Sequence, residues 1–296
     1  VAKLMNDNFI SIKVDREEMP EIDHLYMSVC QAMTGRGGWP LTIVMSPKKE
    51  PFFAGTYFPK TGRGNQPGMI ELIPSLMNAW SNKQDDIQKT IKQVNEYLIS
   101  SNKTASGKSL EKDVIHNAYE NFVERYDNEH GGFGSAPKFP SPHNLIFLLR
   151  YYKSYGEKTA LNMVTKTLEK MRLGGIFDHI GFGFHRYSTD QNWFLPHFEK
   201  MLYDQAMISM AYLEGFKATK NKKYADVVEE VFAYVLRDMT NEEGAFLSAE
   251  DADSEGEEGK FYIWKYEEII NILGTKEGQE FCEIFGIKKD GNCLDE

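Results

Sequence analysis

The chain has 296 residues, of which 41% are hydrophobic and 13% aromatic, so it can bury the cores of two domains. Its formal net charge of -10 argues against a nucleic-acid surface, because phosphate binding depends on lysine and arginine. No run approaches the ~20 apolar residues that cross a bilayer, and no signal-peptide pattern opens the chain, so neither a membrane nor export is expected.

The first hundred residues alternate between strand and helix patterns. Apolar runs predict strands, and helical spacing after Pro20 predicts a helix that begins there. The predicted elements are a strand at 9–14, a helix at 20–33, strands at 41–46 and 51–55, and helices at 69–80 and 85–99. This β-α-β-β-α order predicts a mixed sheet with helices on its faces, in a first domain over residues 1–101. The small, polar stretch 102–108 is interpreted as a linker.

A second domain, residues 109–296, carries only helical patterns. Helices are predicted at 109–126, 142–155, 157–172, 197–219, 222–239 and 265–273. Tight turns at Gly156 and at 220–221 alternate with long loops at 127–141, 173–196 and 240–264. In antiparallel helical hairpins alternate connections lie at the same end, so the three long loops should meet there. The loops share a glycine-aromatic pattern, which suits repeated hairpins that close into a ring.

The densest chemistry lies where the second long loop enters the next helix. Proline is favoured at the first position of a helix, so Pro196 predicts a helix start there. This start places His197 in the first turn, where the helix dipole disfavours a protonated imidazole ring. Helical spacing puts Lys200 and Asp204 on the face of His197. Glu199 and Tyr203 fall on the adjacent face. This pattern indicates an acid–base pocket with His197, Asp204 and Glu199 as catalytic candidates; the alternative is a histidine that only shapes the loop.

The loop itself adds ligand-binding candidates. His185 is a further catalytic candidate, and Arg186 offers a fork for a carboxylate or phosphate. Tyr187 and Trp193 can stack on a flat ligand face, and His143 matches His197 by the Pro-His repeat. The alternative is a loop held together by ion pairs and aromatic contacts.

Residues 248–259 form an acidic stretch in which Asp251 and Asp253 could reach a pocket. Its start resembles a calcium loop, but Tyr262 stands where that loop needs glutamate. No HExxH, GxSxG, phosphate-loop or dinucleotide fingerprint is present, so no metal and no cofactor is predicted. Three widely spaced cysteines form no disulfide or zinc pattern and favour a reducing, cytoplasmic compartment: Cys30, Cys282 and Cys293. Trp39-Pro40 enters a strand, where a cis bond is one solution.

Long motifs across the chain resemble the spermatogenesis-associated protein 20-like family. They are VDREEMPEIDHLYM, TGRGGWPLTIVMSP, FAGTYFP, GGFGSAPKFPSPHN, HIGFGFHRYSTDQNWFLPHFEKMLYDQA and SAEDADSEGEEGKFYIW. The resemblance implies an α+β/α chain: an incomplete thioredoxin-like domain, with Pro40 at the cis-proline position, followed by part of an (α/α)6 toroid of the six-hairpin glycosidase and N-acylglucosamine 2-epimerase type. It also implies a fragment truncated at both ends, with about three of six hairpins present.

Three functions remain open at this point. The barrel type implies a sugar hydrolase or epimerase with a small sugar-like ligand. The family carries a Cys-His-Trp-Cys stretch ahead of this segment, which implies a redox or protein-handling module whose cysteines are not in these residues. The third is a non-catalytic scaffold that binds a ligand.

Overall fold

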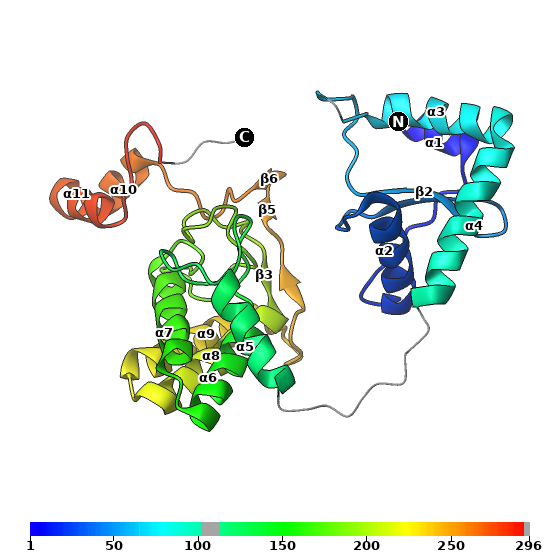
Figure 1. Ribbon diagram of the computed structural model, residues 1–296. Coiled ribbons are helices and arrows are strands. Elements are labelled where there is room, and N and C mark those ends of the chain that lie inside the picture. Colours follow the sequence, from blue (N-terminus) through cyan, green and yellow to red (C-terminus); the bar gives the residue numbers. More distant parts are fainter. Residues whose placement is uncertain (65, 102–112, 293–296) are drawn as a thin grey trace. The chain divides into compact units, whose positions relative to one another are not determined.

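A computed structural model describes residues 1–64, 66–101 and 113–292 (Figure 1). It separates into two compact units, Val1–Leu110 and Glu111–Glu296. The predicted linker at 102–108 and Cys293 lie outside the described residues.

The first unit holds one β-hairpin with helices packed on it. Helix α2 begins at Pro20 and ends before Gly35, whose left-handed backbone closes the helix. Helices α2 and α4 pack on β2, and their small core contains Val29, Cys30, Ala54 and Val94. The elements are α1 (Ala2–Asn8), α2 (Pro20–Thr34), β1 (Thr42–Met45), β2 (Pro51–Gly55), α3 (Met69–Asn82) and α4 (Gln84–Ser101). Strands β1 and β2 are antiparallel, with a register shift between Val44 and Met45.

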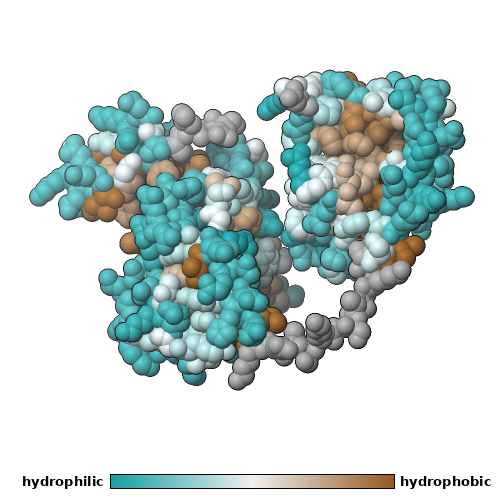
Figure 2. All heavy atoms as spheres, viewed as in Figure 1, coloured by the Kyte–Doolittle hydropathy of each residue, from teal (hydrophilic) through white to brown (hydrophobic). Residues whose placement is uncertain are grey.

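The strand predicted at residues 9–14 is wrong. The backbone at Phe9 is extended, but the segment pairs with no strand of the described chain. Ile10 is 93% and Ile12 is 73% exposed. An apolar run becomes a strand only when a neighbouring strand accepts and donates its backbone hydrogen bonds, and β1 and β2 pair only with each other. Apolar residues consequently lie at the surface of this unit, as Figure 2 shows.

The described part of the second unit is built from helices, with two two-stranded ribbons, β3-β4 and β5-β6, that are too short to form a sheet layer. Its helices are α5 (Asp113–Arg125), α6 (Pro142–Tyr155), α7 (Lys158–Leu173), α8 (Leu202–Thr219), α9 (Lys222–Asp238), α10 (Tyr266–Leu273) and α11 (Thr275–Ile284). The strands are β3 (Lys200–Met201), β4 (Ala249–Glu250), β5 (Asp253–Ser254) and β6 (Glu257–Glu258). The predicted helices are therefore confirmed except for the start of α8, and α11 was not predicted.

Alternate helices of this unit pack against each other. Helix α6 lies against both α7 and α8, and α8 lies against α9. Their shared core includes Leu145, Leu148, Leu168, Ala211 and Val231, none of which exposes more than 1% of its surface. Contact between α6 and α8, with α7 between them in sequence, is the packing of successive hairpins side by side. The predicted class, an α+β domain followed by helical hairpins, is confirmed.

The three long loops meet, as their alternation predicted. The first loop (126–141) joins the second (174–201) through the Trp193 Nε1 hydrogen bond to the His130 carbonyl oxygen at 3.0 Å. The second joins the third (239–265) through pairing of Lys200 with Glu250. Figure 1 shows these loops gathered at one end of the helices.

A buried lysine closes the first loop. Asp127 Oδ1 accepts hydrogen bonds from two backbone N–H groups that follow it, and its Oδ2 accepts from Lys138 Nζ at 2.6 Å. Lys138 also donates to the carbonyl oxygens of Gly131 and Gln191 and is fully buried. All three ammonium donors thus have acceptors, which a buried charge requires.

The second loop repeats this arrangement with different residues. Asp178 Oδ1 accepts from the N–H groups of Ile180 and Gly181, and its Oδ2 accepts from Lys200 Nζ at 2.8 Å. Lys200 also donates to the Phe182 carbonyl oxygen at 2.9 Å. In both loops the lysine ammonium donates hydrogen bonds to the aspartate and to the carbonyl oxygen of the residue four positions after that aspartate. The first two loops therefore share a repeated turn, which in the second loop lies at Asp178–Phe182, after the glycine-aromatic motif at Gly174.

Candidate active site

The second loop folds back on itself just before α8. Arg186 N–H donates to the Glu199 carbonyl oxygen and His197 N–H donates to the Tyr187 carbonyl oxygen, so residues 184–188 and 196–200 form an antiparallel ribbon. This ribbon uses the residues that were expected to begin the helix. Helix α8 starts at Leu202 instead, so the predicted first-turn position of His197 is wrong and the helix-dipole argument does not apply to it. Cross-strand pairing, rather than helical spacing, decides which side chains meet.

The first pair on the ribbon is ionic. Arg186 NH1 donates to Glu199 Oε2 at 2.7 Å, and the two side chains are 26% and 25% exposed. Burial lowers the pKa of Arg186, but the hydrogen bond and charge of Glu199 together with Tyr203 outweigh burial, and the pKa is raised. Arg186 is therefore a fixed cation held by a charge-assisted hydrogen bond to the carboxylate of Glu199.

Asp204 lies next to this pair, in the first turn of α8. The pKa of Asp204 is raised to about 7, chiefly by burial; the charge of Arg186 opposes the rise and that of Glu199 adds to it. Its Oδ2 is buried and has no hydrogen-bond partner among the described residues. A carboxyl group that exchanges its proton near neutral pH can serve as an acid or a base.

The second pair on the ribbon is aromatic. The rings of Tyr187 and His197 stack with centroids 4.7 Å apart and 16° between their planes. Glu258, from β6 of the third loop, lies 2.7 Å from His197 Nδ1. A carboxylate can only accept, so Nδ1 carries the proton in this contact, and in the neutral ring Nε2 keeps its lone pair. The contact with Glu258 thus fixes the orientation of the His197 ring and leaves Nε2 as the atom that could accept a proton, as a general base requires.

His185 lies under the third loop. It is 2% exposed, its Nδ1 has no partner within the described chain, and the rings of Phe198 and Tyr262 stand edge-on to it. Burial and then the charge of Lys200 lower the pKa of His185 to about 3, so it stays neutral. Phe198, at φ 55°, packs its ring against Gly259, where a Cβ would come within 2.4 Å. The third loop therefore seals His185 from solvent.

Two predicted ligand-binding residues are internal supports. Lys200 is 1% exposed, held by Asp178, with its Nζ 4.3 Å from the ring centre of Tyr234. Trp193 is fully buried, and its Nε1–H donates a hydrogen bond to the carbonyl oxygen of His130. Neither presents a polar group to a ligand, so both are removed from the proposed site.

The other predicted residues lie at the surface. Tyr203 is 46% exposed on α8, and His143 is exposed in the first turn of α6. Asp251 and Asp253 are exposed on the third loop, where Asp251 Oδ1 accepts from the Asp253 N–H. Within the ranges that the structure describes, no three His, Cys, Asp or Glu side chains are grouped to hold a metal ion.

Two residues next to the ribbon escaped the sequence reasoning. Glu258 stood within an acidic stretch that gave no reason to single it out. Phe139, from the first loop, places its ring 4.9 Å from that of Tyr187. Both pairings join loops that are far apart in sequence, so only the predicted meeting of the long loops pointed to them.

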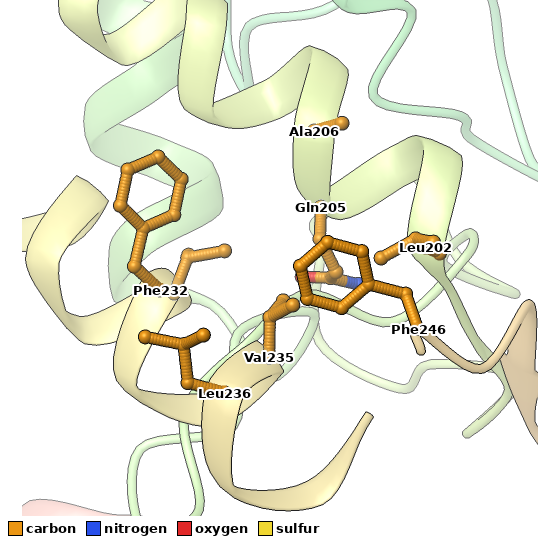
Figure 3. A pocket seen from close by; sticks show the side chains of 8 residues that line it. Leu202, Gln205, Ala206, Phe232, Val235, Leu236 and Phe246 are labelled. Carbon is orange, nitrogen blue, oxygen red and sulfur yellow. The ribbon is translucent and has the colours of Figure 1, made fainter. Parts of the chain in front are cut away.

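An apolar groove lies beside the site on the helices. Its volume is about 400 Å³, and Figure 3 shows its walls coming from α8, α9 and the third loop. It is lined by Leu202, Gln205, Ala206, Val231, Phe232, Val235, Leu236 and Phe246.

In the first unit the Trp39–Pro40 peptide bond is cis. Trp39 Nε1 donates to Asp23 Oδ1 at 2.8 Å, and the Arg16 guanidinium lies 4.4 Å from the Trp39 ring centre. Cys30 is fully buried. Across both units, none of the described helices is long and apolar enough to cross a membrane.

Comparison with known proteins gives relatives for both units. A family model named Thioredox_DsbH, described as a protein of unknown function (DUF255), matches residues 1–99. Among solved structures, a cellobiose 2-epimerase from Bacillus thermoamylovorans is similar with TM-score 0.42 and 15% identity, over 58% of this chain and 53% of that one. An unsaturated glucuronyl hydrolase specific for heparin gives TM-score 0.41 and 11% identity, over 92% and 83%.

Sequence relatives cover almost the whole chain. Human spermatogenesis-associated protein 20 is 36% identical over 99% of this chain and 40% of its own length. An uncharacterised protein of Caenorhabditis elegans is 38% identical over 93% of this chain and 39% of its own length. The chain thus spans about two fifths of the curated relatives that it matches, and it belongs to the spermatogenesis-associated protein 20-like family.

Proposed function

We propose that the second unit is a carbohydrate-active unit, a hydrolase or epimerase in type, that works by acid–base chemistry where its long loops meet. The observation that carries the proposal is Asp204, whose pKa of about 7 and unpartnered buried oxygen suit proton exchange at neutral pH. The barrel type that the family resemblance implies supplies the sugar class.

The neighbours of Asp204 support a division of roles. Protonated Asp204 can donate to a glycosidic or carbonyl oxygen, while the carboxylate of Glu199, held in place by Arg186, stabilises positive charge that develops on the sugar. His197, oriented by Glu258, can accept a proton from water or from a carbon next to a carbonyl. Either reaction moves one proton to the base and one from the acid, so no redox partner is needed.

Turnover measurements test this proposal. Neutral aldoses and disaccharides would be incubated with the chain in D2O and followed by proton NMR, which detects both bond cleavage and deuterium uptake at carbon. Asp204→Asn should lower the rate about 10²- to 10⁴-fold, the usual contribution of a positioned acid or base. Asp226→Asn, an exposed acid on α9, is the matched control and should leave the rate unchanged. Equal turnover by Asp204→Asn and wild type would reject the proposal.

The match of residues 1–99 to Thioredox_DsbH favours a second candidate, thiol–disulfide chemistry in the first unit. Cys30 and Cys282, the described cysteines, are both buried, so this chemistry would need cysteines other than these. Insulin-disulfide reduction by this chain tests the candidate. Reduction that survives replacement of Cys293 by serine would show that a buried cysteine is reachable after all.

A further inference from the structure

Three rings from two loops form a continuous stack beside the proposed site. Tyr187 contacts both other rings: His197 is stacked on it with centroids 4.7 Å apart, and Phe139 is tilted by 34° against it at 4.9 Å. Phe139 ends the stack and is 45% exposed. His197, at the other end, is held by Glu258. The stack therefore has a fixed end and an open end.

The backbone around Phe139 is fixed rather than loose. Its neighbour Lys138 exchanges two backbone hydrogen bonds with Ser188, at 2.8 and 2.9 Å, and both of these residues are fully buried. The following residue, Pro140, is buried as well. An extended segment points successive side chains to opposite sides, so burial of Lys138 and Pro140 turns Phe139 outward. A single exposed aromatic is ordinary, but a rigidly placed one that extends a stack toward solvent is preorganised to take another ring.

The charges near the stack favour an uncharged ligand. Glu258, which contacts the His197 end of the stack, is 51% exposed, and the ribbon adds Glu199 and Asp204. The cations of the ribbon are already paired, Arg186 with Glu199 and Lys200 with Asp178, and Lys138 beside Phe139 is paired with Asp127. A phosphate or carboxylate on the ligand would therefore lie near acidic side chains that repel it. Among the described side chains of the ribbon, no unpaired cation would offset this repulsion.

We propose that Phe139, backed by Tyr187 and His197, stacks against the apolar face of a neutral pyranose ring and so acts as a specificity-determining residue. The inference rests on the proposed carbohydrate function and narrows it to neutral glycans. Aromatic rings gain stability from such flat contacts beyond the surface that they bury, by roughly 0.5–1.5 kcal/mol. Loss of the ring should therefore weaken binding by up to about tenfold.

Titration calorimetry with a panel of neutral disaccharides (cellobiose, lactose, maltose and mannobiose) tests the inference, with glucose 6-phosphate as the anionic comparison. Phe139→Ala should weaken binding of whichever neutral sugar the wild type takes, and Phe139→Tyr should retain it. Phe194→Ala, which removes a ring that is 48% exposed on the second loop, is the matched control and should bind like the wild type. Circular dichroism of each variant confirms that it is folded.

Several results would overturn the inference: no neutral sugar bound by the wild type, equal binding by Phe139→Ala, or glucose 6-phosphate bound as tightly as the neutral sugars. Failure of the proposed function looks different. If Asp204→Asn keeps full turnover while Phe139→Ala weakens binding, the acid–base assignment fails and the stacking site stands. If Asp204→Asn is inactive and Phe139→Ala binds normally, the stacking site fails and the acid–base assignment stands.

Discussion

Replacement of Lys200 by methionine should strongly destabilise the helical unit. Lys200 is 1% exposed, and its ammonium donates to Asp178 at 2.8 Å and to the Phe182 carbonyl oxygen at 2.9 Å. Burial raises the pKa of Asp178, but Lys200 and backbone N–H donors outweigh burial and hold the pKa below its ordinary value. Without Lys200 the buried carboxylate loses its counterion, which costs about 3–5 kcal/mol for comparable pairs.

The measurement is urea denaturation followed by circular dichroism. Lys217→Met is the matched control, because Lys217 pairs with Glu214 at the same 2.8 Å but with side chains 57% and 36% exposed. Exposed pairs contribute about 0–1 kcal/mol, so this variant should unfold almost like the wild type. Adding Asp178→Asn to Lys200→Met should recover part of the loss, because the uncompensated charge is gone. A Lys200→Met variant within 1 kcal/mol of the wild type, about the limit for exposed pairs, would refute the assignment of Lys200 as an internal support.

Two further stability predictions concern the site acid and the first loop. The pKa of Asp204 is raised to about 7, above its unfolded value of about 4, so its contribution to stability is complete below pH 4 and is lost as pH rises through 7. Denaturation of wild type and Asp204→Asn across this range should show the wild type losing stability relative to the variant; parallel profiles would contradict the shift. Gly132 and Gly134 have φ of 77° and 78°, but a Cβ on Gly132 would come within 2.6 Å of the Trp193 ring and one on Gly134 would meet nothing within 4 Å. Gly132→Ala should therefore lower the free energy of unfolding by about 1–3 kcal/mol more than Gly134→Ala does, because of overpacking alone. Equal losses of stability in thermal unfolding would disprove the close contact.

Much of the helical unit was predictable because its signals are local. Helix α6 begins at Pro142 and ends before Gly156, and α9 begins after Asn221, whose side chain accepts from the Lys223 N–H. The start of α8 was not predictable in this way. Pro196 carries the same local signal as Pro142, yet the backbone of residues 196–201 pairs with residues 186–188 and with the third loop and does not become helical. Tertiary hydrogen bonds override a helix-start signal there.

The sequence indicated several residues of the proposed site, but it did not predict the contacts between them. His197, Glu199 and Asp204 were chosen because reactive side chains are dense in one segment. Their partners were not, because Arg186 meets Glu199 across a ribbon and Glu258 comes from another loop. The burial of Lys138 and Lys200 was also unpredictable, since lysine is almost never buried without a partner, and each partner aspartate is set by a turn many residues away.

The proposed function depends on Asp204 exchanging its proton near neutral pH where the long loops meet. The most direct test is a carbon NMR titration of the chain with its aspartate carboxyl groups labelled, compared with Asp204→Asn. One aspartate resonance should titrate with a midpoint near pH 7, and that resonance should be missing from the variant. Titration of every aspartate below about pH 5, in the range of ordinary carboxyl groups, would contradict the claim.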